Sequence, residues 1–347
     1  ALSIKSTNPI LEGIKIKAEG DFLTLTATDT ELTIIKKIKA DVLMEGETVV
    51  VGKYFVEFSK KLEKEQVELS NLSGEKLEIK YSDSVSELQI FSSENFPKTE
   101  INENGNYFAL TQNEFKKMVE KTVFSCSIDD SRPILKGCLF EIKDSLLTVV
   151  ALDGFRMSVV KKNIETNGDF SIVIPARTLQ EITRLLEKDD EQLKVILNNN
   201  TLMVEVENSI LISRLIEGEF VKYNHILPSS FENIVTVNKN QLLSSIERAS
   251  IVAKNDRYNI IKFDVKEETM SISAKSEIGN VNENVNINLT GKDITIAFNG
   301  KYIMEFLKIV DSEFVSLNFN SPIDPCILQP MGDEEFLYLV LPVRISG

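Results

Sequence analysis

Short runs of alternating apolar and polar residues recur along the chain and predict half-buried antiparallel strands joined by short polar turns. Four such runs are LEGIKIKA, FLTLTATD, QVELSNL and KLEIKYS. A helical pattern appears further on, where Phe115, Met118, Val119, Thr122 and Val123 are spaced i, i+3, i+4, i+7 and i+8 and would form one apolar stripe. The sequence therefore predicts an α+β fold with antiparallel sheets.

An internal repeat organises these elements. Residues 9–29 align without a gap on residues 133–153, with eight identities in 21 positions at an offset of 124 residues. GKYFVEF at 52–58 recurs as GKYIMEF at 300–306, at twice that offset, and ARTLQEI at 176–182 is the intermediate copy. Because self-similarity at a fixed period marks repeated structural elements, we expect three repeats of about 124 residues, each with strands and two helices.

Polar segments that contain Pro and Gly separate the repeats at 92–105 and 217–231. We therefore place domain 1, domain 2 and domain 3 at residues 1–104, 105–229 and 230–347. Three full repeats would need 372 residues, 25 more than the 347 present. The second repeat has a strand and a helix ahead of Pro133, whereas the first begins almost at Pro9. We expect about 25 residues, including the first helix of domain 1, to be missing from the amino terminus.

The helix at each GKY-type segment is predicted to have one apolar and one basic face. At 100° per residue, Lys53, Lys60 and Lys64 fall on one side of the first such helix, opposite Phe55 and Phe58. In the other two repeats, five of the six equivalent outer positions are also basic, namely Arg177, Arg184, Lys188, Lys301 and Lys308, with Ser312 as the sixth. The other helix type agrees in part, because Lys121 corresponds to Arg248.

Charge is sorted between the helices and the rest of the chain. The sequence has 39 basic and 53 acidic residues, a net charge of −14, which argues against a uniformly basic surface. The predicted helices nevertheless carry 15 basic and nine acidic residues, at 53–64, 111–126, 176–188, 238–254 and 300–311. A positive helical surface suits a phosphate backbone read without sequence specificity. The alternative is that any solvated helix face collects lysine and that repeats inherit each other's residues.

The sequence lacks the motifs that mark many enzymes. It has no P-loop, no GxGxxG and no HExxH, and its single histidine, His225, leaves no second imidazole for a His-dependent metal site or triad. Asp29 and Asp153 could be offered as an acid pair, but each ends a strand in a different repeat, and we interpret them as turn or capping residues. We expect no catalytic residue, no metal and no cofactor.

Cysteine usage and hydropathy indicate the cytoplasm. Cys126, Cys138 and Cys326 are far apart in the sequence and form no CxxC pair, so neither a disulfide framework nor a zinc site is indicated. No apolar run approaches about 18 residues, and the first residues lack the basic and apolar regions of a signal peptide. We expect a soluble protein of the reducing cytosol, without a membrane partner.

Six stretches of the chain resemble the beta subunit of bacterial DNA polymerase III, the family of replicative sliding clamps. They are SRPILKG (131–137), ALDGFRM (151–157), VIPAR (173–177), SRLIEGEFVKYNHILP (213–228), DITIAFNGKYIMEFLK (293–308) and LVLPVRI (339–345). The resemblance implies a three-domain crescent that pairs head to tail into a homodimeric ring of six domains, with sheets outside and helices lining the hole. It also implies a processivity factor that encircles duplex DNA and tethers the replicative polymerase and other DNA-processing enzymes.

The same resemblance implies an apolar cleft between the second and third domains. In the family it takes short peptide motifs of the polymerase III catalytic subunit, the clamp loader, repair polymerases and mismatch-repair proteins. The positions carried onto it are Leu135, Leu152, Gly154, Phe155, Arg156, Met157, Val221, Ile226, Leu339, Leu341, Pro342, Val343 and Arg344. Leu152, Phe155 and Val221 stand where the family often has Thr, His and Pro, which bears on peptide preference. LYLVLPV could instead be a terminal core strand.

For the ring joint we assign Leu88 and Ile90, on the candidate edge strand VSELQIF, to face Ile251 and Val252 of the partner subunit's third domain. An open apolar edge strand is an aggregation hazard that pairing with a second subunit removes. An internal strand would show the same pattern. The expected DNA-facing residues are Lys53, Lys60, Lys64, Lys121, Arg177, Arg184, Lys188, Arg248, Lys301 and Lys308.

Two other functions compete with the replicative clamp. One is a clamp-like ring specialised for repair or for a plasmid or phage replisome. The other is a carboxylate-pair hydrolase built on the repeat, which would need two carboxylates in one cleft.

Overall fold

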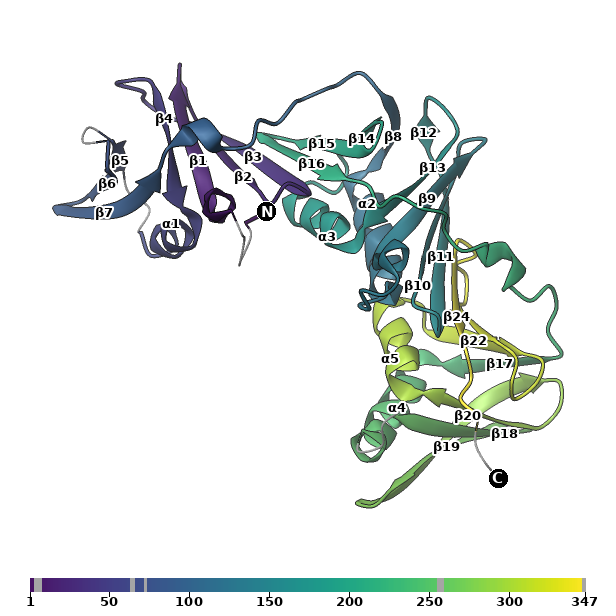
Figure 1. Cartoon of the computed structure of the whole chain (residues 1–347). Coiled ribbons are helices and arrows are strands. Elements are labelled where there is room, and N and C mark those ends of the chain that lie inside the picture. Colours follow the sequence, from purple (N-terminus) through teal and green to yellow (C-terminus); the bar gives the residue numbers. More distant parts are fainter. Residues whose placement is uncertain (3–7, 63–65, 72–73, 255–258, 345–347) are drawn as a thin grey trace. The chain divides into compact units, whose positions relative to one another are not determined.

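The computed structural model describes residues 1–347 except 3–7, 63–65, 72–73, 255–258 and 345–347 (Figure 1). The chain forms two compact units. Unit 1 comprises residues 1–112 and 184–215, and unit 2 comprises residues 113–183 and 216–347. The middle sequence repeat therefore contributes residues to both units.

Unit 1 contains a continuous antiparallel sheet. Its strands are, in spatial order, β8 (Asn106–Thr111), β14 (Gln192–Asn198), β15 (Thr201–Val206), β16 (Ser209–Arg214), β3 (Leu32–Lys39), β2 (Phe22–Thr28), β1 (Gly13–Glu19), β4 (Gly46–Val51), β7 (Ser84–Phe91), β6 (Lys76–Tyr81) and β5 (Val67–Ser70). The four runs predicted as strands form β1, β2, β5 and β6, which confirms those predictions. Pairing of β16 with β3 joins strands of the middle repeat to strands of the first.

The alternation along these strands buries one set of side chains against a short helix, α1 (Gly52–Ser59). Ile16 on β1 and Ile79 on β6 are buried, and Phe55 and Phe58 of α1 pack against this core. The helix predicted over 53–64 is shorter than expected, because it ends at Ser59. Short 3-10 turns precede and follow this region, η1 (Pro9–Glu12) and η2 (Ser93–Asn95).

Unit 2 also contains one antiparallel sheet. Its strands are, in order, β13 (Phe170–Pro175), β9 (Gly137–Lys143), β10 (Leu146–Leu152), β11 (Arg156–Asn163), β24 (Phe336–Val340), β23 (Cys326–Pro330), β22 (Phe314–Phe319), β17 (Asn233–Asn238), β20 (Gly279–Thr290), β19 (Thr269–Ser276), β18 (Ile260–Lys266) and β21 (Ile294–Asn299). β12 (Glu165–Thr166) is a two-residue strand.

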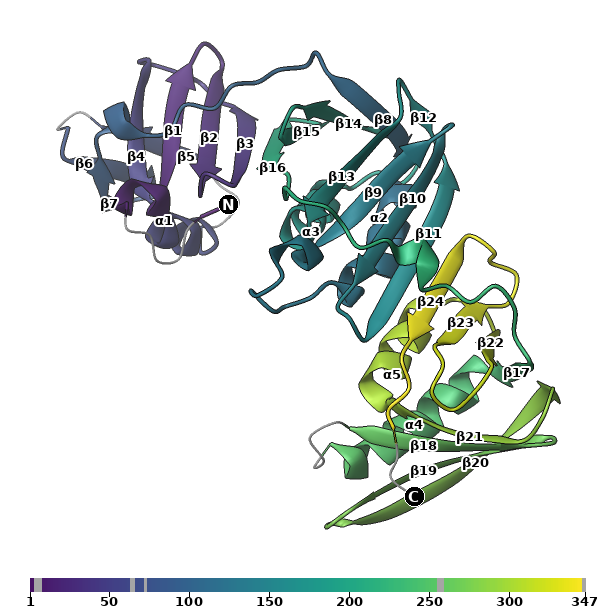
Figure 2. The ribbon, with the colours of Figure 1, turned by 45° about the vertical axis from the view of Figure 1, so that its right-hand side comes forward.

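The pairing of β24 with β11 joins the middle and third repeats within unit 2 (Figure 2). Its register aligns Arg156 with Val340 and Met157 with Leu339. Residues far apart in the sequence are thereby brought together, and most of the predicted peptide-cleft positions lie close to this seam.

The remaining helices are α2 (Gln112–Thr122), α3 (Ala176–Leu185), α4 (Lys239–Ala253) and α5 (Gly300–Ile309), with 3-10 turns η3 (Val123–Ser125), η4 (Pro133–Lys136) and η5 (Tyr223–His225). The stripe predicted for α2 is confirmed, since Phe115, Met118, Val119 and Thr122 are all buried. Val123 departs from it, because it begins η3 instead of continuing the α-helix. No helix among the described residues is long and apolar enough to cross a membrane.

Helices α4 and α5 begin in the same way and pack on each other. The side chains of Asn238 and Asn299 cap them by accepting hydrogen bonds from backbone N–H groups of the first turn. Each helix buries one apolar stripe, which includes Ile246 on α4 and Phe306 on α5. Their polar faces are left for solvent, as the helical spacing predicts.

Candidate functional site

The strand ends at Asp29 and Asp153 form the same kind of tight turn in two different repeats. Asp29 Oδ1 accepts hydrogen bonds from the backbone N–H groups of Glu31 and Leu32, at 3.1 and 2.8 Å. Asp153 Oδ1 accepts from those of Phe155 and Arg156, at 2.9 and 3.1 Å. Asp29 and Asp153 are therefore turn residues, as predicted from the sequence.

The turn at Asp153 positions the Arg156 side chain between the start of β11 and helix α5. The Arg156 side chain is 7% exposed and its Nε lies 3.0 Å from Asp153 Oδ2. It also forms an ion pair with Glu305 of α5 and donates to the Phe124 carbonyl oxygen at 2.6 Å. The rings of Phe124 and Tyr302 lie 5.4 and 4.5 Å from its guanidinium carbon.

These contacts make Arg156 an internal bridge. Burial disfavours its charged form, but Tyr338 and the Glu305 carboxylate outweigh that effect and hold the pKa of Arg156 above its usual value. The family resemblance implies that Arg156 lines the peptide cleft. In the structure its guanidinium hydrogen-bonds to Asp153, Glu305 and the Phe124 carbonyl oxygen. Phe124, Tyr302 and Glu305 were not among the predicted site residues, although Glu305 stands in a column of repeated glutamates with Glu57 and Glu181.

Four of the predicted cleft residues lie together in the core of unit 2. Leu135, Leu152, Met157 and Leu339 are at most 5% exposed and form one cluster with neighbours that include Tyr223. The part of the LYLVLPV segment that forms β24 is thus a core strand, which was the alternative interpretation of that segment. These four side chains can support a cleft from below but present little surface to a ligand.

Four other predicted cleft residues have exposed apolar side chains. Phe155 is 61% exposed, Val221 40%, Ile226 38% and Leu341 36%. Phe155 stacks on Tyr302 at a centroid distance of 6.5 Å, and its carbonyl oxygen accepts a hydrogen bond from the Leu341 N–H at 2.8 Å.

The remaining cleft positions are Gly154, Pro342, Val343 and Arg344. Gly154 occupies the turn with a φ of +94°, a conformation that favours glycine. Val343 donates its N–H to the carbonyl oxygen of Ala297, which fixes the chain after β24 to β21, whereas Pro342 is half-buried and Arg344 is exposed.

The predicted DNA-facing cations lie mostly on the polar faces of their helices or just beyond the helix ends. Exposed positions are Lys53, Lys60, Arg177, Arg184, Lys188, Arg248, Lys301 and Lys308, and Lys64 lies outside the described residues. Lys121 differs from this group, because it is only 23% exposed. Its Nζ lies 2.6 Å from Asp333 Oδ2 and 5.4 Å from the Phe336 ring centroid, so it ties α2 to the turn before β24.

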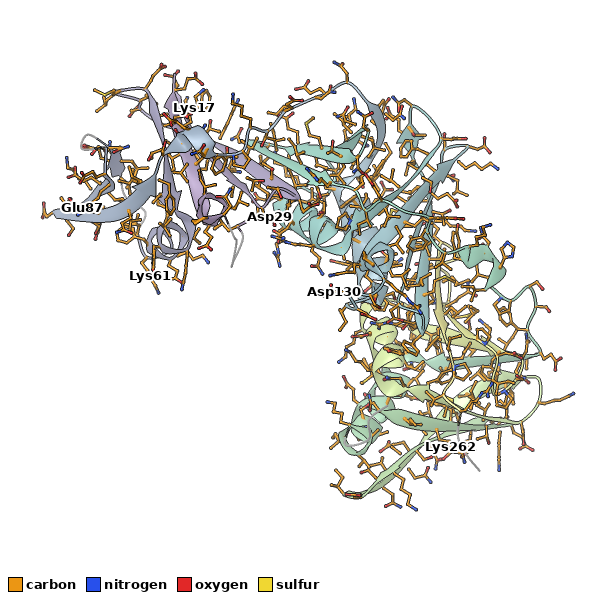
Figure 3. All side chains as sticks on the ribbon, in the orientation of Figure 1. Lys17, Asp29, Lys61, Glu87, Asp130 and Lys262 are labelled. Carbon is orange, nitrogen blue, oxygen red and sulfur yellow. The ribbon has the colours of Figure 1, made fainter. Side chains whose placement is uncertain are left out.

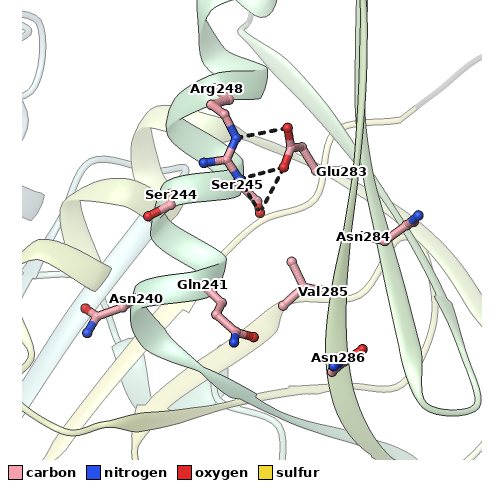
Figure 4. A pocket seen from close by; sticks show the side chains of 9 residues that line it. All are labelled: Asn240, Gln241, Ser244, Ser245, Arg248, Glu283, Asn284, Val285 and Asn286. Atoms are coloured by element: carbon pink, nitrogen blue, oxygen red, sulfur yellow. Dashed lines mark hydrogen bonds and ion pairs between the residues drawn. The ribbon is translucent and has the colours of Figure 1, made fainter.

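Several exposed cations are also paired with carboxylates. Lys308 Nζ lies 3.1 Å from Glu247 Oε1, and Lys188 Nζ lies 2.9 Å from Glu191 Oε1. Arg248 forms two hydrogen bonds with Glu283 at one side of a groove of 470 Å³ between α4 and β20 (Figure 4). Polar side chains dominate the groove, which is lined by Asn240, Gln241, Ser244, Ser245, Arg248, Glu283, Asn284, Val285 and Asn286.

The residues assigned to the ring joint differ in exposure. Leu88 and Ile90 on β7 are partly buried and pack against the core of unit 1. Ile251 on α4 is 67% exposed, whereas Val252 is 8% exposed. Strand β7 pairs with β4 only through Ile90 and Phe91, so in the described structure its earlier residues, which include Glu87 (Figure 3), pair on one side only, with β6.

Comparison with known proteins identifies the family. Models of the DNA polymerase III beta subunit match the chain at residues 1–100 (N-terminal domain), 109–222 (central domain) and 224–344 (C-terminal domain). These three domain matches, which agree with the threefold repeat and the antiparallel sheets, place the chain in the class of sliding clamps. The chain belongs to the DNA polymerase III beta subunit family, the beta sliding clamps.

Individual relatives span nearly the whole chain. The beta sliding clamp of Halalkalibacterium halodurans is 32% identical over 359 residues, covering 99% of this chain and 94% of the relative. A solved putative DNA polymerase III beta subunit from Eubacterium rectale is 32% identical with a TM-score of 0.93, covering 99% of this chain and 94% of that one. The sliding clamp of Bacillus subtilis is 26% identical with a TM-score of 0.95, covering 100% and 94%.

Proposed function

We propose that this protein is a processivity clamp that forms a head-to-tail homodimeric ring around duplex DNA and tethers polymerases to it. The observation that carries the proposal is the match of three clamp domains along one chain whose helices expose cations at equivalent positions. Weak phosphate contacts permit sliding, while a closed ring prevents escape and keeps bound enzymes at high local concentration. The clamp acts as a subunit of the polymerase holoenzyme in the cytoplasm and has no catalytic site of its own.

The domain boundaries that we propose for this ring are 1–104, 105–229 and 230–347. Each domain boundary falls in a polar joint of the sequence. The ring would close where the open part of β7, with Leu88 and Ile90 behind it, meets Ile251 and Val252 of the partner subunit. The exposed apolar surface of Ile251 favours this assignment, because a large exposed apolar side chain on a helix gains from burial in an interface.

The peptide cleft that we propose is formed by Phe155, Val221, Ile226 and Leu341 above the buried cluster of unit 2. It would take short apolar motifs of the polymerase III catalytic subunit, the clamp loader, repair polymerases and mismatch-repair proteins. Burying one large apolar side chain contributes about 1.5–3 kcal/mol. Phe155→Ala should therefore weaken binding of a labelled polymerase-tail peptide about tenfold or more, whereas Phe22→Ala, a 45% exposed residue on β2, should not. Equal affinities of the two variants would remove Phe155 from the cleft.

Retention on circular and linear DNA tests the clamp function. The protein is loaded by a clamp loader onto nicked circular duplex, half of the sample is linearised, and both halves are passed over a gel-filtration column in moderate salt. Retention on circles with loss from linear DNA is the expected result, because a ring slides off free ends. Equal, salt-sensitive loss from both forms would show surface binding and would contradict encirclement.

A further inference from the structure

Two glutamates hold exposed cations of the third repeat in ion pairs. On α4, Glu247 and Arg248 are adjacent in the sequence and each pairs with another element. Glu247 Oε1 lies 3.1 Å from Lys308 Nζ on α5. Arg248 Nε and Nη2 donate to the two carboxylate oxygens of Glu283 on β20, at 2.9 and 2.6 Å (Figure 4).

The geometry at Arg248 is built from three side chains. Ser245, one turn earlier on α4, lies 3.3 Å from Arg248 Nη2 and 3.5 Å from Glu283 Oε2 through its hydroxyl oxygen. The hydrogen bonds from Arg248 hold the pKa of the Glu283 carboxyl below its usual value, so this carboxylate is charged at neutral pH. The side chains of Arg248 and Lys308 are nevertheless 53% and 56% exposed, so a phosphate could reach either of them.

A cation that is paired with a carboxylate binds DNA phosphate more weakly than a cation without such a partner. A surface ion pair contributes little to stability, so it is weak enough to be exchanged for a phosphate contact. The exchange still leaves a carboxylate beside the phosphate backbone, and like charges repel. Each phosphate contact normally makes the logarithm of the DNA affinity fall with the logarithm of salt by a slope of about 0.9.

We propose that Glu247 and Glu283 act as internal counter-ions of Lys308 and Arg248 and thereby lower the DNA affinity of the clamp. The two cations still attract phosphates, but each phosphate contact competes with an ion pair within the protein. This proposal rests on the proposed clamp function. The two glutamates are positioning residues for the DNA-facing cations, and their effect would be to favour sliding over arrest.

The test measures binding of the full chain to a short linear duplex by fluorescence anisotropy between about 50 and 200 mM salt. Glu247→Gln and Glu283→Gln should each increase the slope of log affinity against log salt by about 0.9, the value for one phosphate contact. Over this salt range, that increase is an extra loss in affinity of about 3.5-fold. The double variant should show an extra loss of about 12-fold.

Glu19→Gln is the matched control, because Glu19 pairs with Lys17 on β1 at 2.6 Å and its loss adds the same net charge away from the helices (Figure 3 labels Lys17). A steeper slope in the two test variants and an unchanged slope in the control is the expected result. Unchanged slopes throughout, or an equal change in the control, would overturn the proposal. Retention of the wild-type protein on circular DNA is a separate readout, so failure of the counter-ion role and failure of the clamp function are distinguishable.

Discussion

Arg156 connects elements that are distant in the sequence, at the scale of a single residue. It contacts the turn after β10, the carbonyl of Phe124 in η3 and Glu305 on α5. The motif ALDGFRM made the position visible, but its partner Glu305 lies 149 residues away. Sequence patterns report which face of an element is apolar, and they do not report which charges meet across elements, so the bridging role could not be predicted.

Removing the Arg156 charge should destabilise unit 2. Arg156→Met leaves Asp153 and Glu305 without their buried cation, and breaking a buried ion pair costs about 3–5 kcal/mol. Urea unfolding monitored by circular dichroism measures the change. Lys136→Met is the control, because the Lys136–Asp130 pair is exposed and should contribute at most about 1 kcal/mol. A loss below that value for Arg156→Met would contradict the bridge.

Tyr223 gives a second residue-scale prediction, on pH. Burial and the hydrogen bond to Glu141, 2.8 Å away, raise the pKa of Tyr223 from 10.0 to about 12. The folded state therefore retains a proton that the unfolded state releases above pH 10, so this contribution to stability is present below pH 10 and is lost as pH rises toward 12. In urea titrations, Tyr223→Phe should lose stability less steeply over that interval than the wild type. Parallel curves would rule out this role for Tyr223.

The secondary-structure elements were the most predictable level. Strand alternation located β1, β2, β5 and β6, and helical spacing identified the buried stripe of α2. Both patterns depend on neighbours in sequence, which is why they can be recognised without a structure. Burial depends on tertiary packing, so the assignment of Leu135, Met157 and Leu339 to a cleft lining could not be distinguished from a core position until the β11–β24 seam was known.

The exposed end of α4 gives a prediction about assembly. Ile251→Lys should weaken the homodimer about tenfold to a hundredfold, because the interface would lose the burial of one aliphatic side chain, about 1.5–3 kcal/mol. Sedimentation over a range of protein concentrations measures the dissociation constant. Ile323→Lys is a close control, since Ile323 is 63% exposed against 67% for Ile251. Unchanged dimerisation of Ile251→Lys would place the joint elsewhere.

At the scale of the whole molecule, the repeat predicted three similar domains, and six stretches that resemble the beta-subunit family indicated the family before any contact was known. The offset of 124 residues relates many equivalent positions of the repeats, so the repeat can be recognised even where single positions differ. The sequence could not show which cations are neutralised in place. Lys121, Lys308 and Arg248 all meet carboxylates from other elements, and only tertiary structure brings these together.

Reversing charge at three positions on helices or directly after a helix end should impair DNA retention without unfolding the protein. In the variant Lys60→Glu, Arg184→Glu, Lys308→Glu, three exposed cations become anions that repel phosphate, so retention on circular DNA and stimulation of the polymerase should both fall severalfold. The control reverses Lys37, Lys143 and Lys266, three exposed lysines on strands. If the helical and strand triples behave alike, net charge alone governs retention and the helical faces have no special role.

The seam between β24 and β11 also sets an order of events during synthesis. Strand β11 is complete at residue 163, but its partner β24 begins only at residue 336. At about 5–20 residues per second, the ribosome needs roughly 9–35 s to make the intervening chain, and during this interval the strand edge has no partner. An open edge can pair with other chains. The nascent clamp therefore passes through an interval in which a chaperone that shields strand edges would improve its yield.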